Sequence, residues 1–192
     1  MAPPPSSEPH ARRTIFVTFR DAALEMWGKE GLRAIGERLT PEARRDTVDA
    51  VVIAADWLPE AHALAWFGAV YEGPAGRMTS EYHRFLDRSM DLGFGRVRRL
   101  MLATAMTPSS LGHRAAELWR HDHTHGELTC RDVGARSIVL TLHDHVYATT
   151  PLGRTTIAEI YRHISSLTRA KEVFAKLQQA GPASVAVNIS WI

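Results

Sequence analysis

The 192-residue sequence is poor in several features, and each scarcity excludes a class of protein. It has one cysteine, Cys130, so no disulfide can form within the chain and nothing points to an oxidising compartment. Its 23 basic and 21 acidic residues nearly cancel to a net charge of +2, which gives no support for nucleic-acid binding. The most apolar windows, residues 51–55 and 63–71, are far shorter than the ~20 residues of a membrane helix. The proline-rich start also lacks the apolar core of an export signal, so we expect a cytoplasmic protein without membrane contact.

The motifs of several enzyme classes are missing as well. The sequence contains no GxSxG, no P-loop, no GxGxxG followed by an acidic residue, no HExxH and no CxxC pair. The sequence therefore gives no motif support for a hydrolase, a nucleotide-binding protein or a zinc finger. It favours a protein that is not an enzyme.

What is present is the composition of a globular domain, with 45% hydrophobic and 23% charged residues. Residues 1–12 are rich in proline and are predicted to form a disordered tail, while residues 13–192 are predicted to form a single domain. After a short predicted strand at 14–19, apolar residues recur at spacings of three and four. These spacings predict a series of helices, the first over 21–39.

From His121 onward the hydrophobic period changes from 3.6 to 2. Alternating apolar residues predict an antiparallel hairpin over 123–147, with its turn at Gly134, and a terminal strand from Val185. The segment 170–179 is predicted to be helical. The predicted fold is thus α+β, with a helix-rich N-terminal part packed on a small antiparallel sheet.

Five of the ten histidines lie in two short segments, three in residues 121–127 and two in residues 143–145. A register that places Leu128 opposite Ile138 keeps the apolar residues on one face and sets His123 opposite His143. Directly opposed side chains are close enough to share a Zn²⁺, Ni²⁺ or Fe²⁺ ion. The candidate metal ligands are His123, His125, His143, His145 and Glu127, the last as a ligand or a base.

Plainer interpretations stand beside the metal site. A polar strand face is usually solvated or covered by a partner, and several neighbouring imidazoles can simply make a surface pH-sensitive. Isolated histidines on helices, such as His62 and His113, are expected to be hydrogen-bonded core or boundary residues. Cys130 lies on the apolar face of its strand and is expected to be inert packing.

The order of elements, ending in the strand Val187–Trp191, resembles a large paralogous family of myxobacterial proteins of unknown function. Members of that family carry an amphipathic Leu-x-x-Ile-Gly helix near the start, which corresponds here to Leu32–Gly36. More distantly, the chain resembles the α/β modules of the haem-nitric-oxide-binding and vinyl-reductase-like group, which bind hydrophobic ligands or pair with partners. The haem group's Tyr-x-Ser-x-Arg signature is absent from this sequence. The resemblance therefore implies ligand sensing or scaffolding and argues against haem.

The sequence favours a non-enzymatic sensory or scaffolding domain that binds a small apolar ligand or a protein partner, and that forms a homodimer. The alternative is a metal-dependent enzyme or metal sensor that uses His123, His125 and His143 with Zn or Fe. A nucleic-acid binder that uses Arg96, Arg98 and Arg99 ranks last.

Overall fold

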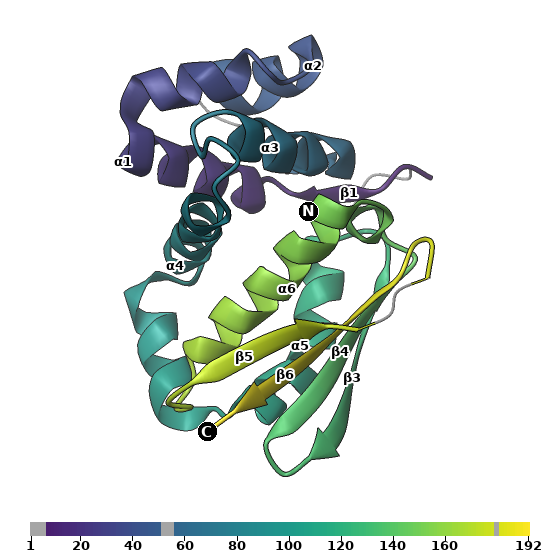
Figure 1. Ribbon diagram of the computed structural model, residues 1–192. Coiled ribbons are helices and arrows are strands. Elements are labelled where there is room, and N and C mark those ends of the chain that lie inside the picture. The colour runs from purple at the N-terminus through teal and green to yellow at the C-terminus, as the bar shows by residue number, and fades with distance from the viewer. Residues whose placement is uncertain (1–6, 51–55, 179–180) are drawn as a thin grey trace. The chain divides into compact units, whose positions relative to one another are not determined.

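The computed structural model describes residues 7–50, 56–178 and 181–192, and the chain divides into two compact units, Met1–Gly93 and Phe94–Ile192 (Figure 1). Helices dominate the first unit, and the second combines helices with an antiparallel sheet. The α+β class expected from the sequence is confirmed.

The first unit is built around a cluster of aromatic side chains. Phe19 is at its centre, with its ring centroid 6.0 Å from that of Trp66, 5.7 Å from Phe67 and 5.8 Å from Phe85. These four side chains are buried. The elements of this unit are β1 (His10–Arg12), α1 (Arg13–Gly36), α2 (Pro41–Arg44), the π-helical turn η1 (Arg45–Asp49), β2 (Trp57–Pro59), α3 (Glu60–Glu72) and the first part of α4 (Thr79–Ala105).

The start of the first unit differs from the sequence prediction. Residues 14–19, predicted as a strand, form the first turns of α1, because Phe16, Phe19 and Ala23 recur at helical spacing and are all buried. Helical packing of these side chains outweighs the strand preference of the β-branched and aromatic residues. The paired strand β1 lies inside the range that the sequence assigned to the tail and pairs antiparallel with β2.

The second unit contains a four-stranded antiparallel sheet of order β3-β4-β6-β5. Helix α5 packs against β3 and β4, and α6 packs against β5 and β6 (Figure 1). The hairpin and the terminal strand are confirmed. The elements are the second part of α4, α5 (Pro108–Asp122), β3 (Glu127–Gly134), β4 (Ser137–His143), the 3₁₀ turn η2 (Val146–Thr149), α6 (Pro151–Ser166), β5 (Val173–Leu177) and β6 (Val185–Trp191).

The helix predicted over 170–179 is wrong. The segment forms strand β5, in which Val173 pairs with Trp191 and Leu177 with Val187; residues 179 and 180 lie outside the described residues. A short isolated helix is marginal in water, whereas the edge of β6 offers a full set of backbone hydrogen-bond partners. The neighbouring strand therefore decides the conformation of this segment.

The register of the β3–β4 hairpin also differs from the predicted one. Leu128 lies opposite Leu142, not Ile138, and Glu127 lies opposite His143. The turn falls at residues 135–136 between Gly134 and Ser137, after an irregularity next to Asp132. The shift is an even number of residues, so the apolar side chains still share one face, but the predicted pair of His123 with His143 does not form.

Candidate functional site

Helix α5 carries one side of the candidate site in the second unit. Its start is fixed by a capping box in which the Ser110 amide donates to Thr107 Oγ1 (3.1 Å) and the Thr107 amide donates to Ser110 Oγ (3.0 Å). Gly112 lets the helix approach the sheet closely, because a Cβ atom there would lie 2.6 Å from Ile138 Cδ1. At the other end of α5, the Trp119 ring lies 4.8 Å from the ring of His145, which follows β4.

Trp119 and His123 form the centre of the site at this end of α5. Their rings stack with centroids 3.8 Å apart and planes 10° from parallel. The His123 amide donates to the Trp119 carbonyl (2.9 Å), and the Trp119 indole N–H donates to the His125 carbonyl (3.1 Å). The loop after α5 is therefore folded back over a largely buried indole.

His145 approaches the same rings from the end of β4. Asp144, with φ of 50°, breaks the alternation of the strand, so His145 points inward and is 2% exposed. Gly126, with φ of 77°, passes so close that a Cβ atom there would lie 2.8 Å from His145 Cδ2. Both backbone positions are needed to bring this imidazole against the end of α5.

The rings of Trp119, His123, His145 and Tyr147 together form what we call the ring cluster. The His145 ring meets Trp119 (4.8 Å between centroids, 81°), His123 (5.6 Å, 89°) and Tyr147 (4.5 Å, 74°) edge to face. Such edge-to-face contacts are favourable between aromatic rings. The cluster thus packs two imidazoles against an indole and a phenol ring, and Trp119, His145 and Tyr147 are buried.

The hydrogen bonding of His145 limits its chemistry. The backbone N–H of Tyr147 donates to His145 Nδ1 (3.3 Å). Nδ1 is thus an acceptor, and a neutral His145 carries its proton on Nε2. This hydrogen bond occupies one of the two ring nitrogens of His145.

The five predicted metal ligands are not brought to one place. His123 and His145 join the ring cluster, whereas His125 Nδ1 is 2.8 Å from Thr124 Oγ1. His143 lies at the end of β4 opposite the exposed Glu127, and its Nε2 is 3.5 Å from Thr129 Oγ1. Metal binding by this set stays a prediction.

Sequence reasoning missed Trp119 and Tyr147. A usable signal was available for Trp119, because it precedes His123 by four residues, the spacing of neighbours on one helix face. Treating residues 121–123 as strand concealed that relation, since α5 continues to Asp122.

Two further predictions concern the contact between α5 and β3. His113 is hydrogen-bonded, as expected, but it is exposed and not a core or boundary residue: its Nε2 lies 2.8 Å from Asp132 Oδ2, while Ser109 Oγ donates to Asp132 Oδ1 (2.7 Å). These bonds hold the pKa of Asp132 below its usual range.

Burial, together with the negative charge of Asp132, raises the pKa of the Cys130 thiol to about 11. Cys130 is therefore protonated at neutral pH, as expected of inert packing.

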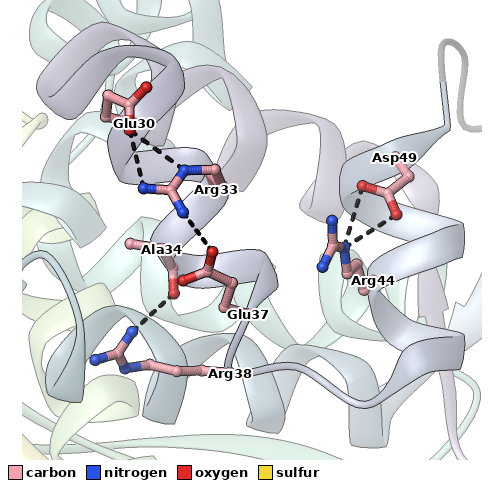
Figure 2. Close-up of polar contacts among 7 residues, drawn as sticks. All are labelled: Glu30, Arg33, Ala34, Glu37, Arg38, Arg44 and Asp49. Atoms are coloured by element: carbon pink, nitrogen blue, oxygen red, sulfur yellow. Dashed lines mark hydrogen bonds and ion pairs between the residues drawn. The ribbon is translucent and has the colours of Figure 1, made fainter.

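The first unit contains a separate cavity of about 230 Å³ near Gly36. Its two arginines are paired: Arg33 with Glu30 and Glu37, and Arg44 with Asp49 (Figure 2). Histidine, cysteine, methionine and tyrosine, the usual protein ligands of haem iron, are not among its lining residues. This cavity does not fit a haem. It is lined by Lys29, Leu32, Arg33, Gly36, Arg44, Val48 and Asp49.

Comparison with known proteins identifies the fold. No family description and no curated protein sequence matches the chain. Among solved structures, it is similar to the Fe(II) unliganded H-NOX protein from K. algicida (TM-score 0.64, 12% identity, 94% of this chain and 96% of that chain). It is also similar to an oxygen-binding H-NOX domain related to soluble guanylate cyclases (TM-score 0.61, 11% identity, 94% of each chain). A mutant H-NOX of T. tengcongensis matches with TM-score 0.60 and 11% identity, over 94% of this chain and 97% of that one.

The chain has the fold of H-NOX domains, and the distant resemblance to the haem-nitric-oxide-binding group is confirmed at that level. The sequence argument against haem is wrong. One match, with TM-score 0.64 and 11% identity, comes from work on the modulation of haem redox potential by porphyrin distortion. At such low identity, the absence of one short signature carries little weight against a fold used by haem proteins.

Across the described part of the chain, no helix has the length and apolarity needed to span a lipid bilayer.

Proposed function

We propose that this chain is a non-enzymatic sensor domain that binds a haem, or a flat apolar ligand of similar shape, through the ring cluster. The observation that carries the proposal is the similarity in fold to H-NOX domains over 94% of the chain. One of those proteins is described as an Fe(II) unliganded form and the other as an oxygen complex. The fold alone does not assign a ligand, so the chemistry of the residues must support it.

The donor chemistry of the ring cluster fits a haem. Imidazole is a common axial ligand of haem iron, and aromatic faces suit a flat macrocycle. His123 would hold the iron, because stacking on Trp119 fixes the position of its imidazole. The iron of a bound haem would supply reversible binding of a diatomic gas such as oxygen.

The chain's own residues would hold that donor in place. Trp119 fixes the plane of the His123 ring, and the indole N–H bond to the His125 carbonyl anchors the following loop. The rings of His145 and Tyr147 meet the His123 ring edge to face and restrict its movement. Such support is what keeps the orientation of a ligating imidazole constant.

The experiment is a haem reconstitution of the tag-free full chain, followed by absorption spectroscopy in the Soret region. We expect His123→Ala to weaken haem binding and to shift the Soret band. His121→Ala is the matched control, because His121 lies at the same helix end but is exposed and paired with Asp122 (2.8 Å). Haem binding that both variants leave unchanged would reject His123 as the donor, and a chain that binds no haem would reject this ligand class.

A second candidate function is a metal-dependent enzyme or metal sensor that uses His123, His125 and His143 with Glu127. The observation that favours it is the β3–β4 register, which places Glu127 opposite His143. Metal analysis of protein made without a histidine tag separates the candidates. Stoichiometric Zn or Fe that disappears in His143→Ala would favour the metal function.

A homodimer or other protein partner would carry the signal onward, and the cytoplasm is its predicted location. Light scattering coupled to size exclusion tests the dimer. A mass of twice 21.4 kDa is expected, and a strict monomer would contradict it.

A further inference from the structure

A second group of residues that includes a histidine lies in the first unit. Two of its members are on the continuous segment formed by α2 and η1, residues 41–49, which we call the α2–η1 segment. Glu42 and Asp46 are four residues apart on this segment, so their side chains project from one face. Thr40 caps the segment by accepting from the Ala43 amide (3.2 Å). The segment then widens into the π-helical turn η1, a conformation frequently found at functional sites.

A buried hydrogen bond fixes this segment against α3. The Trp66 indole N–H donates to Thr47 Oγ1 (2.8 Å), and Thr47 Oγ1 in turn donates to the Ala43 carbonyl (2.6 Å). Trp66 and Thr47 are both fully buried. His62 precedes Trp66 by one helical turn on α3, so it faces the same segment. The contact therefore directs His62 toward the carboxylates.

His62 is the unusual member of this group. Its side chain is 6% exposed, and its Nε2 has no hydrogen-bond partner among the residues that the structure describes. Asp46 Oδ2 lies 3.7 Å from this nitrogen. Buried polar atoms are nearly always satisfied, so an imidazole nitrogen held in this way calls for an additional partner.

We propose that Glu42, Asp46 and His62 bind a divalent transition-metal ion, with Zn²⁺ as the best match. One ligand atom from each residue lies within 4.8 Å of the other two. Zn²⁺ binds imidazole nitrogen and carboxylate oxygen at about 2.0–2.2 Å, which places tetrahedral ligand atoms roughly 3.4 Å apart. The 3.7 Å between His62 Nε2 and Asp46 Oδ2 is already close to that separation.

The surrounding charges are compatible with this ion. Arg45 Nε donates to Asp46 Oδ1 (2.8 Å), which leaves the other oxygen directed at His62. That arginine is 71% exposed, so the pair is solvated and weak. Three protein ligands leave a position open to water. The ion would join the α2–η1 segment to α3, a role independent of ligand sensing by the ring cluster.

The test is Zn²⁺ binding to tag-free full chain, measured by competition with a chromophoric chelator. The background carries His123→Ala and His143→Ala, so that zinc held by the histidines of the hairpin region is not counted. We expect one Zn²⁺ per chain. We also expect affinity to fall by about 10- to 100-fold or more in both Glu42→Gln and His62→Gln.

Two further variants make the result decisive. Glu42 is exposed, so Glu42→Gln should fold normally even if a change at the buried His62 does not. Asp49→Asn is the matched control, because Asp49 is an exposed carboxylate on the same turn that pairs with Arg44 instead. It should leave Zn²⁺ affinity unchanged.

Absence of stoichiometric Zn²⁺ binding would overturn the proposal, as would binding that Glu42→Gln leaves intact. In the metal-free alternative, His62 contacts Asp46 without an ion, and Zn²⁺ does not raise the melting temperature. The proposed function is tested separately by haem absorption, so either proposal can fail alone.

Discussion

The two units of this chain place histidine in contrasting surroundings. In the second unit, His123 and His145 are packed among aromatic rings. In the first, His62 faces the carboxylates of Glu42 and Asp46. The same side chain is thereby suited to different partners: aromatic walls favour a flat apolar ligand, whereas carboxylates favour a divalent cation. The comparison shows that the neighbours of a histidine, and not the number of histidines nearby in sequence, define its chemistry.

The largest expected effect comes from removing the contact that positions His62. Trp66→Ala should lower the free energy of unfolding by about 3–5 kcal/mol, because a fully buried indole leaves a cavity. It should also abolish Zn²⁺ binding. Chemical denaturation and the chelator assay measure both effects. Trp57→Ala is the control, since that indole is only half-buried and packs under Arg12, and its cost should be clearly smaller.

An intermediate effect is expected at the ring cluster from Gly126→Ala. The new Cβ would meet His145 at 2.8 Å and would also require a positive φ, so we expect a loss of about 1–3 kcal/mol. Gly76→Ala separates the two causes, because Gly76 has φ of 59° but open space around it. Equal losses in the two variants would show that the close approach to His145 is unimportant.

The reactivity of Cys130 gives a smaller but sharp test of the α5–β3 contact. With a pKa of about 11, the thiol should react with iodoacetamide at pH 8 far more slowly than a small-molecule thiol. The rate should rise as pH approaches 11. Fast alkylation at pH 8 under native conditions would mean that α5 does not cover this residue.

The smallest effect is expected at Asp132. Hydrogen bonds from His113 and Ser109 lower the pKa of Asp132 in the folded chain. The ionised Asp132 therefore stabilises the fold at pH values above its unfolded pKa of about 3.9. This stabilisation is lost as the pH falls through the lower pKa of the folded chain. Thermal unfolding of the natural chain and of Asp132→Asn should differ slightly at neutral pH and converge in acid. A difference that grows below pH 3 would contradict the assignment.

Sequence reasoning recovered the parts of the fold that depend on local signals. The alternation of apolar and polar residues that predicts the hairpin and the terminal strand is set within a few residues, and both elements are present. The segments at 14–19 and 170–179 were assigned wrongly because their conformation depends on partners distant in sequence. The predicted hairpin register is wrong because hydrophobic alternation allows several registers and the length of the turn selects among them.

The two candidate sites were only partly predictable for the same reason. His123 and His145 were singled out from sequence, but their meeting depends on Asp144 and Gly126, whose positive φ angles no periodicity reveals. His62 was set aside as an isolated helical histidine. Its relation to Asp46 arises only when Trp66 docks on Thr47 across the unit.

We propose that the ring cluster of this chain binds a haem or a flat apolar ligand of similar shape. The most direct measurement is a haem titration of the full chain, monitored in the Soret region, before and after addition of a diatomic gas. The account predicts saturation at one haem per chain and a Soret band that moves when the gas is added. The proposal would be contradicted by a titration that never saturates, or by a bound haem whose spectrum does not change when the gas is added.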